Sequence, residues 1–478
     1  MLFEIGVILA CLIGACTLYF WTLFAKQCWT LKKFKGPFAL PMLGNCYHGE
    51  ALYFLRYMVR LRKKFGKIFT FFGFTKPYLV VCDPIVVRRI LSDSKTFYKG
   101  TDYTHQFSVA FGQGLVTSNG DKHKKDRAVF GKYFIRSNIN KLTKLINDIS
   151  VQAIDDMLVS ADGKPKVHNI EHFFATVALR VFMKFSIGTD YRTNPAREKE
   201  LCHAVSTGSW AVGRVISLGV PMWSFIPWVK LIKTARASVL SDFHSIVAER
   251  RAQMAAGTCE LDDCLTAMIA EDMNETDMAD HFVTLICAGH DTTAYFSSYM
   301  CMLLAQNPEV QEKLYEEIKT TPDEITPDDV IELKYLQKVM QETLRLYSII
   351  PQVTRVSAEE VHIKEANVTI PAGVNCLIPM FLINRDPEIW DNPAQFIPER
   401  FDGRSNVDFT SAKNGFFPFG YGSRTCIGNT LAQIESTIFM CKLLKKFRFE
   451  EDVGFKPSIL SGISLTTSNG INISISPR

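Results

Sequence analysis

The residue with the clearest chemical signature is Cys426, which stands in a glycine-rich turn directly before a predicted helix over residues 429–446. Glycines at positions 420, 422 and 428 permit positive φ angles and let backbone amides approach the sulfur closely. Arg424 adds a permanent cation, and the N-terminus of the helix directs its positive dipole end at the same place. These features favour the thiolate over the thiol and predict a chemically active cysteine.

A thiolate in such a turn could serve as a redox sensor, a nucleophile, a zinc ligand or the axial ligand of a haem. Zinc requires nearby Cys or His partners, but the closest other cysteine is Cys441 and no histidine follows His362. A nucleophilic cysteine usually borrows a histidine base, and the local sequence suggests none. The spacing therefore argues against a zinc ligand and a nucleophile.

A second chemically suggestive stretch is residues 288–293, in the middle of a helix predicted over residues 276–305. It reads Ala-Gly-His-Asp-Thr-Thr, and glycine and threonine are poor choices for the interior of a long helix. A threonine here would bond the carbonyl one turn back and open the helix locally. The pattern predicts an interrupted helix that carries an acid, Asp291, beside a hydroxyl, Thr292.

Both stretches resemble the cytochrome P-450 family of haem-thiolate monooxygenases. The loop pattern Phe-x-x-Gly-x-Arg-x-Cys-x-Gly is met in full from Phe419, as is Ala-Gly-x-Asp-Thr-Thr. Glu342 and Arg345, three residues apart, together with Arg400, resemble the charge triad that ties a helix to the loop before the cysteine. The resemblance covers nearly all of the chain after the first helix. It implies a mainly α fold with a small β-rich portion and one catalytic domain.

The resemblance implies haem b between the interrupted helix and the loop, with Cys426 on the iron. Cleavage of the O–O bond consumes two protons, which Asp291 and Thr292 would deliver. Gly289 would let the plane of the haem approach the helix, and Phe419 would contact the cofactor from the start of the loop.

The same resemblance places three arginines, Arg127, Arg355 and Arg424, on the haem propionates. Arginine suits a bidentate carboxylate contact better than lysine does. His123 stands where the family has tryptophan, four residues before Arg127. Because an imidazole can donate the same kind of hydrogen bond, His123 is expected to bind a propionate as well.

Composition and charge agree with an intracellular enzyme. The chain is 47% hydrophobic and 22% charged, as ordinary globular proteins are. Thirteen cysteines without framework spacing favour a reducing compartment. The net charge of +5 comes without a long basic run, which gives no sign of nucleic-acid binding.

The first part of the chain predicts a membrane anchor. Residues 5–25 contain no charge and could cross a bilayer as a helix, and four lysines follow within ten residues. A cleaved signal peptide is the alternative, but the apolar run is long for one and lacks a cleavage site. We expect an anchor at 1–25, a basic Pro/Gly-rich linker at 26–50 and a haem-thiolate domain at 51–478, facing the cytosol from the endoplasmic reticulum.

Two hairpins are also predicted. Residues 68–72 and 78–81 form the first, followed by a helix that starts at Asp83-Pro84, and residues 463–467 and 471–475 form the second around Asn469-Gly470.

The resemblance implies insertion of one oxygen atom into a lipophilic substrate, such as a sterol, a fatty acid or another apolar compound. Electrons would come from NADPH through a flavoprotein reductase. Two groups of lysines would meet that acidic partner: Lys122, Lys124, Lys125 and Lys132, and Lys442, Lys445 and Lys446. The alternatives are a haem-thiolate isomerase or dehydratase that acts on peroxides, and a non-catalytic haem sensor. The sequence does not identify the substrate.

Overall fold

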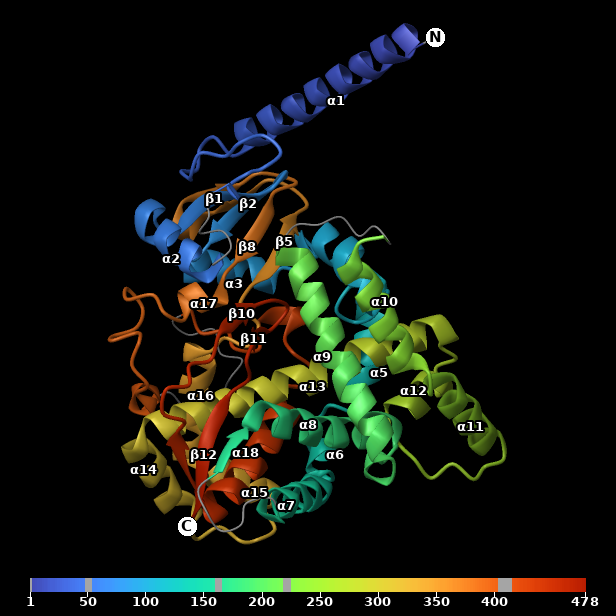
Figure 1. Ribbon diagram of the computed structural model, residues 1–478, viewed down its shortest axis with the longest axis vertical. Coiled ribbons are helices and arrows are strands. Elements are labelled where there is room, and N and C mark those ends of the chain that lie inside the picture. Colours follow the sequence, from blue (N-terminus) through green and yellow to red (C-terminus); the bar gives the residue numbers. More distant parts are fainter. Residues whose placement is uncertain (1, 48–53, 160–165, 218–224, 403–414) are drawn as a thin grey trace.

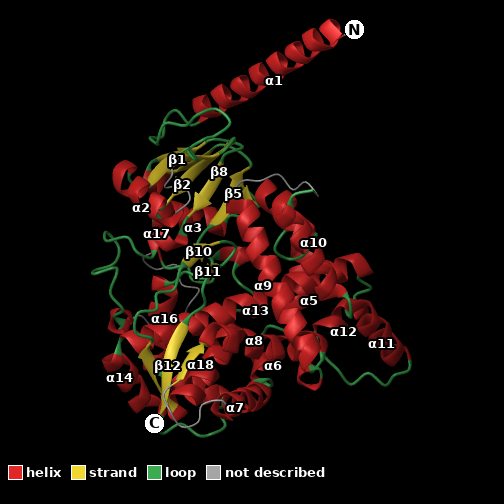
Figure 2. Ribbon diagram, viewed as in Figure 1, coloured by secondary structure: helices red, strands yellow, loops and turns green. Residues whose placement is uncertain are grey.

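Helices dominate the structure. The computed structural model describes residues 2–47, 54–159, 166–217, 225–402 and 415–478, and Figures 1 and 2 show small sheets set against a large helical body. The helices are α1 (Leu2–Thr30), α2 (Phe54–Phe65), α3 (Pro84–Ser92), α4 (Ser108–Phe111), α5 (Gly120–Gly131), α6 (Arg136–Asn140), α7 (Thr143–Val159), α8 (Ile170–Ile187), α9 (Pro195–Ser217), α10 (Pro227–Leu240), α11 (Phe243–Ala255), α12 (Cys264–Ala270), α13 (Glu275–Gln306), α14 (Pro308–Ile318), α15 (Pro327–Glu332), α16 (Lys334–Leu346), α17 (Met380–Ile383) and α18 (Asn429–Lys446). The predicted mainly α class is confirmed.

The strands form one larger sheet and three small ones. They are β1 (Ile68–Gly73), β2 (Lys76–Val81), β3 (Phe97–Tyr98), β4 (Lys166–Asn169), β5 (Val353–Ser357), β6 (Val361–Ile363), β7 (Val368–Ile370), β8 (Asn375–Ile378), β9 (Phe447–Glu451), β10 (Ile459–Ser461), β11 (Leu465–Thr467) and β12 (Asn472–Pro477). The larger sheet has the order β1-β2-β8-β5-β3, with only β2 and β8 parallel.

The first predicted hairpin is confirmed, and the second is wrong. β1 and β2 pair antiparallel, and Asp83 caps α3 through its carboxylate. In the second case β11 pairs with β10, whereas β12 lies between β4 and β9. The Asn469 side chain explains the difference, because it bonds the backbone of Lys456 and Ser458 rather than closing a tight turn.

Helix α13 crosses the core, and its predicted interruption is wrong. Thr292 Oγ1 does donate to the Ala288 carbonyl at 2.6 Å, as the sequence predicted. The backbone nevertheless stays helical from Glu275 to Gln306. The surrounding helices bury α13 along most of its length, so tertiary packing outweighs the low helix propensity of residues 288–293.

The charge triad that precedes the cysteine loop is confirmed. Glu342 and Arg345 on α16 are both fully buried, and their two charge-assisted bonds measure 2.7 and 2.8 Å. Arg400 Nε donates to the same carboxylate at 2.8 Å. Arg345 also bonds the carbonyls of Asn384, Pro393 and Gln395, so α16 is tied to the segment that leads to the loop.

Helix α1 extends away from the body (Figure 1). It runs to Thr30, past the predicted anchor boundary at residue 25, and its end packs on the larger sheet through Phe24 and Phe72, whose ring centroids lie 5.6 Å apart. In the part of the chain that the structure describes, no helix has both the length and the apolar character needed to cross a bilayer. Residues 48–50 of the predicted linker lie outside the described residues, and the three-part division stays a prediction.

Candidate active site

The Cys426 loop is held in a fixed shape by its own backbone. The Cys426 amide donates to the Phe419 carbonyl at 2.8 Å, which closes the loop. Gly422 has φ +74°, and a Cβ there would lie 2.5 Å from the Leu91 carbonyl oxygen, so only glycine fits. Phe419 therefore contributes through its carbonyl at least, and contact of its ring with a cofactor stays a prediction.

The expected preference of Cys426 for the thiolate is wrong for the polypeptide alone. The thiol is free and retains accessible surface, yet surrounding protein is close enough that burial raises its pKa. The Gly428 amide and the Arg127 cation lower the pKa, but by less. A coordinating metal ion would supply the missing charge, because bound thiols are deprotonated outright.

Arg127 reaches the loop directly. It extends from α5, and its Nη2 donates to the Thr425 carbonyl at 2.7 Å, one residue before the cysteine. Arg424 was expected to favour the thiolate, but the arginine whose charge lowers the pKa of Cys426 is Arg127. Arg424 instead points to Asn119, the N-cap residue of α5, with 3.3 Å between Nη2 and Oδ1.

Four cations gather beside this loop, and we call them the cation cluster: Lys99, Arg127, Arg355 and Arg424. They come from the end of β3, from α5, from β5 and from the cysteine loop. Among the described residues, none of the four forms an ion pair with an Asp or Glu side chain, and Arg424 Nη1 is buried without a hydrogen-bond partner. Burying charge without a counter-ion is costly, so the cluster requires an anion.

The electrostatics of the cation cluster support this reading. Burial, and then the charges of Arg355 and Arg127, lower the pKa of Arg424 to about 10. Burial and the three arginines lower the pKa of Lys99 well below its ordinary value. A ligand with two carboxylates would reverse these effects, and two propionates on a porphyrin match that requirement.

His123 lies in the field of the same cations. It is buried on α5, and burial together with Arg424, Lys99 and Arg127 lowers its pKa to about 3. The imidazole is therefore neutral at physiological pH and can offer one N–H donor. The tryptophan that the family has at this position also offers one N–H donor. The contact of His123 with a propionate therefore keeps a physical basis, and it stays a prediction.

Lys99 is the member of the cluster that sequence reasoning missed. Its Nζ donates to the Val116 carbonyl at 2.5 Å, and its backbone is bonded to the Asn119 side chain. No motif marks this lysine, which follows a two-residue strand. The one available signal is a lysine next to Gly100, where an added Cβ would lie 2.3 Å from Val356.

The two predicted proton-delivery residues lie on α13. Asp291 is buried, and its Oδ1 lies 2.8 Å from His290 Nδ1. Thr292 is half-buried and bonds Ala288. In the part of the chain with described placement, neither side chain bonds to Cys426 or to the cation cluster. Their catalytic roles stay predictions.

Gly289 has a packing reason of its own. A Cβ at this position would lie 2.3 Å from Cδ2 of Phe182 on α8, so glycine is needed for α13 and α8 to pack closely. Its predicted contact with the plane of the haem is untested.

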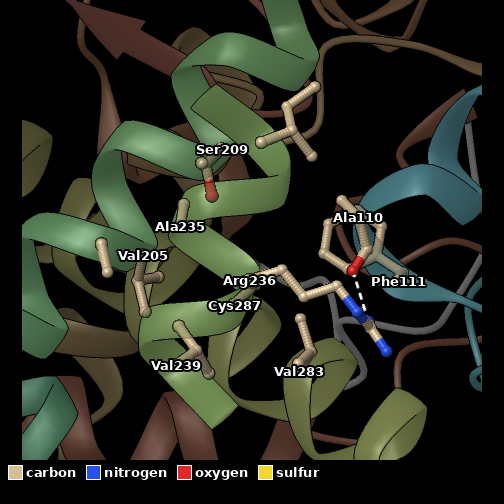
Figure 3. A pocket seen from close by; sticks show the side chains of 12 residues that line it. Ala110, Phe111, Val205, Ser209, Ala235, Arg236, Val239, Val283 and Cys287 are labelled. Carbon is tan, nitrogen blue, oxygen red and sulfur yellow. Dashed lines mark hydrogen bonds between the residues drawn. The ribbon is translucent and has the colours of Figure 1, made fainter. Parts of the chain in front are cut away.

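An apolar pocket lies between α4, α9, α10 and α13 (Figure 3). Its one charged side chain, Arg236, is neutralised, because it pairs with Asp280 at 2.6 Å and donates to the Ala110 carbonyl at 2.7 Å. Cys287, on the pocket wall, stands one helical turn before Asp291. The lining residues are Ala110, Phe111, Ala204, Val205, Gly208, Ser209, Ile232, Ala235, Arg236, Val239, Val283 and Cys287.

Comparison with known proteins decides the family. The model of the family described as Cytochrome P450 matches residues 34–474. The chain belongs to the cytochrome P450 family. Its relatives include Cytochrome P450 4d2 of Drosophila melanogaster, 26% identical over 93% of each chain, and Cytochrome P450 3A56 of Fundulus heteroclitus, 26% identical over 93% of this chain and 92% of the relative. Cytochrome P450 6B2 of Helicoverpa armigera is 28% identical over 91% of this chain and 90% of the relative.

The predicted family is thus confirmed, and this P450 is a haem-thiolate monooxygenase. The residues present fit the haem that the family implies. Cys426 supplies a free thiol with accessible surface, and the cation cluster supplies positive charge with no counter-ion in the described chain.

Replacing Lys99 by methionine should have opposite effects on the two forms of this P450. Haem dissociation should accelerate about tenfold, because one charge-assisted bond is lost. The free energy of unfolding of the apoprotein should rise, because a buried member of a cluster of four mutually repelling cations is gone. Haem transfer to apomyoglobin measures the first effect, and urea unfolding of the apoprotein measures the second. Lys95→Met, at an exposed position four residues earlier, should change neither, and a Lys99→Met variant that retains haem normally would remove Lys99 from the site.

Proposed function

We propose that this P450 inserts one atom of molecular oxygen into a lipophilic substrate, with electrons from NADPH delivered by a flavoprotein reductase. The observation that supports an apolar substrate is the pocket of Figure 3, whose single cation is already paired and whose wall stands one turn from Asp291. The pocket is small as it stands, so a sterol, a fatty acid or a similar compound would meet these apolar side chains only after the helices that line it move apart.

Each part of the site has a distinct task. Haem iron ligated by a thiolate binds oxygen and favours cleavage of the O–O bond. Cys426 would hold the iron, and the cation cluster would hold the propionates. Asp291 would pass protons toward Thr292, and the apolar pocket would orient the substrate and exclude bulk water.

The two alternatives have less support. A peroxide isomerase or dehydratase does not need protons delivered to bound oxygen. A non-catalytic haem sensor does not need an acid such as Asp291. The buried pair of Asp291 and His290 favours a reaction that consumes protons.

Cys426→Ser should abolish the thiolate-type Soret band of the reduced carbon monoxide complex, because a serine hydroxyl is a far weaker donor to iron. Difference spectroscopy measures the band. The unchanged chain, with reductase, NADPH, a lipid extract and isotopically labelled oxygen gas, should yield a product with one labelled atom. A persisting band would assign the iron to another ligand, and NADPH oxidation without labelled product from any extract would contradict the proposed reaction.

The reductase would dock on α5, the helix that carries Arg127. Lys124 and Lys125 are exposed there and form no ion pair with the described residues. The other lysines expected on this face are engaged elsewhere. Lys122 pairs with Asp277 at 3.0 Å, Lys132 with Glu271 at 3.6 Å and Lys446 with Asp155 at 2.9 Å. Lys442 and Lys445 donate to carbonyls of residues 321–323. The free charge that would attract an acidic partner is therefore concentrated at two positions.

The double change Lys124→Glu and Lys125→Glu should slow reduction by the reductase about tenfold at low salt, because attraction becomes repulsion, with a smaller effect at high salt. Stopped-flow reduction under carbon monoxide measures the rate. Lys230→Glu, at an exposed position on α10, is the matched control. Equal rates for the double variant and the unchanged chain would place the docking surface elsewhere.

We propose that α1 holds the enzyme on the endoplasmic reticulum, with the catalytic body in the cytosol. The support is the row of exposed apolar side chains along a helix that projects from the body (Figure 1), including Ile8, Leu12, Leu18 and Trp21. The lysines that follow would stay on the cytosolic side.

Leu12→Lys with Leu18→Lys should release the protein from the membrane fraction, because each charge opposes burial in lipid. Carbonate extraction of microsomes followed by immunoblotting measures the distribution. Leu261→Lys, at a partly exposed site on the body, should leave it unchanged. Membrane retention of the α1 variant would contradict the proposal.

A further inference from the structure

A buried polar cluster lies behind the acid on α13. It consists of Asp291, His290 and Glu435, whose exposed fractions are 5%, 1% and 3%. His290 Nδ1 and Asp291 Oδ1 are 2.8 Å apart, within hydrogen-bond distance. The proposed function described above gives Glu435 no task, and it uses His290 only as the buried partner of Asp291.

Two atoms of this cluster are buried without a partner among the described residues: His290 Nε2 and Glu435 Oε1. Both residues belong to the contact between α13 and α18. Ser297, two turns after His290 on the same face, lies 3.2 Å from Ser436, the neighbour of Glu435. An unpartnered buried polar atom is destabilising, and packing alone would favour apolar residues at both positions.

The electrostatic environment of His290 favours its protonated form at neutral pH. Burial opposes the imidazolium, but the hydrogen bond and charge of Asp291, with a smaller contribution from Cys202 on α9, outweigh it and raise the pKa of His290 to about 10. Burial raises the pKa of Glu435 well above its ordinary value, and the nearby imidazolium only partly offsets this.

The other titratable groups whose charges interact with Asp291 are Glu171, Tyr295 and Cys287. Burial raises the pKa of the Cys287 thiol and of the Tyr295 hydroxyl, so both stay protonated at neutral pH. Glu171 on α8 accepts bonds from Tyr295 at 3.0 Å and Thr467 at 2.6 Å. His290 is therefore the group in direct contact with Asp291 that carries a proton which can pass to the carboxylate.

We propose that His290 is the positioning residue for Asp291: it fixes the carboxyl and supplies it with a proton, while Glu435 holds the imidazole from behind. The inference rests on the proposed role of Asp291 in proton delivery. An isolated aspartate has an ordinary pKa of about 4 and holds no proton at neutral pH. The pair holds one.

In the proton step, the N–H bond at Nδ1 breaks and an O–H bond forms at Asp291 Oδ1. The imidazolium becomes a neutral imidazole with its remaining proton on Nε2. Glu435 Oε1 would accept a hydrogen bond from that Nε2–H, directly or through one water, and so keep Nδ1 turned to Asp291. Asp291 then carries the proton that is consumed on the side of Thr292, and a proton taken up from water restores the imidazolium for the next transfer.

The charge of His290 can be measured without turnover. In the reduced, carbon monoxide-bound holoenzyme with nitrogen-labelled histidine, NMR should show His290 protonated on both nitrogens from pH 6 until the pH approaches about 10. The signal is assigned by its loss in His290→Gln. In Asp291→Asn its titration should move down, toward the ordinary value of about 6.5. A neutral imidazole at pH 7 in the unchanged chain would overturn the proposal.

The second test follows the fate of oxygen. Superoxide leaves without a delivered proton, whereas peroxide and water require protons. With reductase and NADPH, the share of oxygen released as superoxide, measured by spin trapping, should rise about tenfold in His290→Gln. In the unchanged chain this share should stay constant from pH 6 to 9 and rise as the pH passes about 10. The variant should lose that dependence.

Ser436→Ala, in the same contact between α13 and α18, should behave like the unchanged chain in both measurements, and Glu435→Gln should show an intermediate superoxide share. An oxygen partition in His290→Gln within twofold of the unchanged chain would overturn the proposal. A missing thiolate-type band in the unchanged chain would instead refute the proposed function, and the NMR titration would still report on His290.

Discussion

Mutual repulsion among four cations, two of them buried and two half-buried, is the constraint that explains most of this site. Lys99, Arg127, Arg355 and Arg424 come from elements far apart in the sequence, and the fold brings them together without a carboxylate from the described chain. Such an arrangement is unfavourable for a polypeptide alone. It becomes favourable when a dianion enters, so the free energy of folding and the affinity for haem are linked. The neutral state of His123 follows from the same field.

The cysteine loop obeys a related constraint. The polypeptide keeps the Cys426 thiol protonated, because burial outweighs the Gly428 amide and Arg127. The charge triad fixes the chain before the loop without acting on the sulfur. Its members are the buried Glu342 and Arg345 and the half-buried Arg400. The scaffold therefore provides position, and the metal provides the charge that makes the sulfur a ligand. A rigid loop with a weakly acidic thiol also limits side reactions of the sulfur before haem is inserted.

Sequence patterns located the residues of the site better than they described its physics. The loop from Phe419, the stretch at 288–293 and the triad at Glu342 follow from short motifs, and the first hairpin follows from local turn chemistry. What failed depended on distant contacts. The continuity of α13 comes from helices packed around it, the pairing of β12 comes from β4 and β9, and the protonation of Cys426 comes from burial. Lys99 carries no motif, because its role arises only when β3 is placed beside α5 and the cysteine loop.

The hydrogen bond from Arg127 to the Thr425 carbonyl has a mechanical consequence. Helix α5 has exposed lysines on its outer surface and Arg127 on its inner side, and this one 2.7 Å contact joins it to the residue preceding the sulfur. A small shift of α5 would alter the dipole of the peptide linking Thr425 to Cys426, and with it the electron density available to the iron. Helix α5 would thus couple events at its outer surface, such as the docking of a partner, to the electronic state of the haem iron.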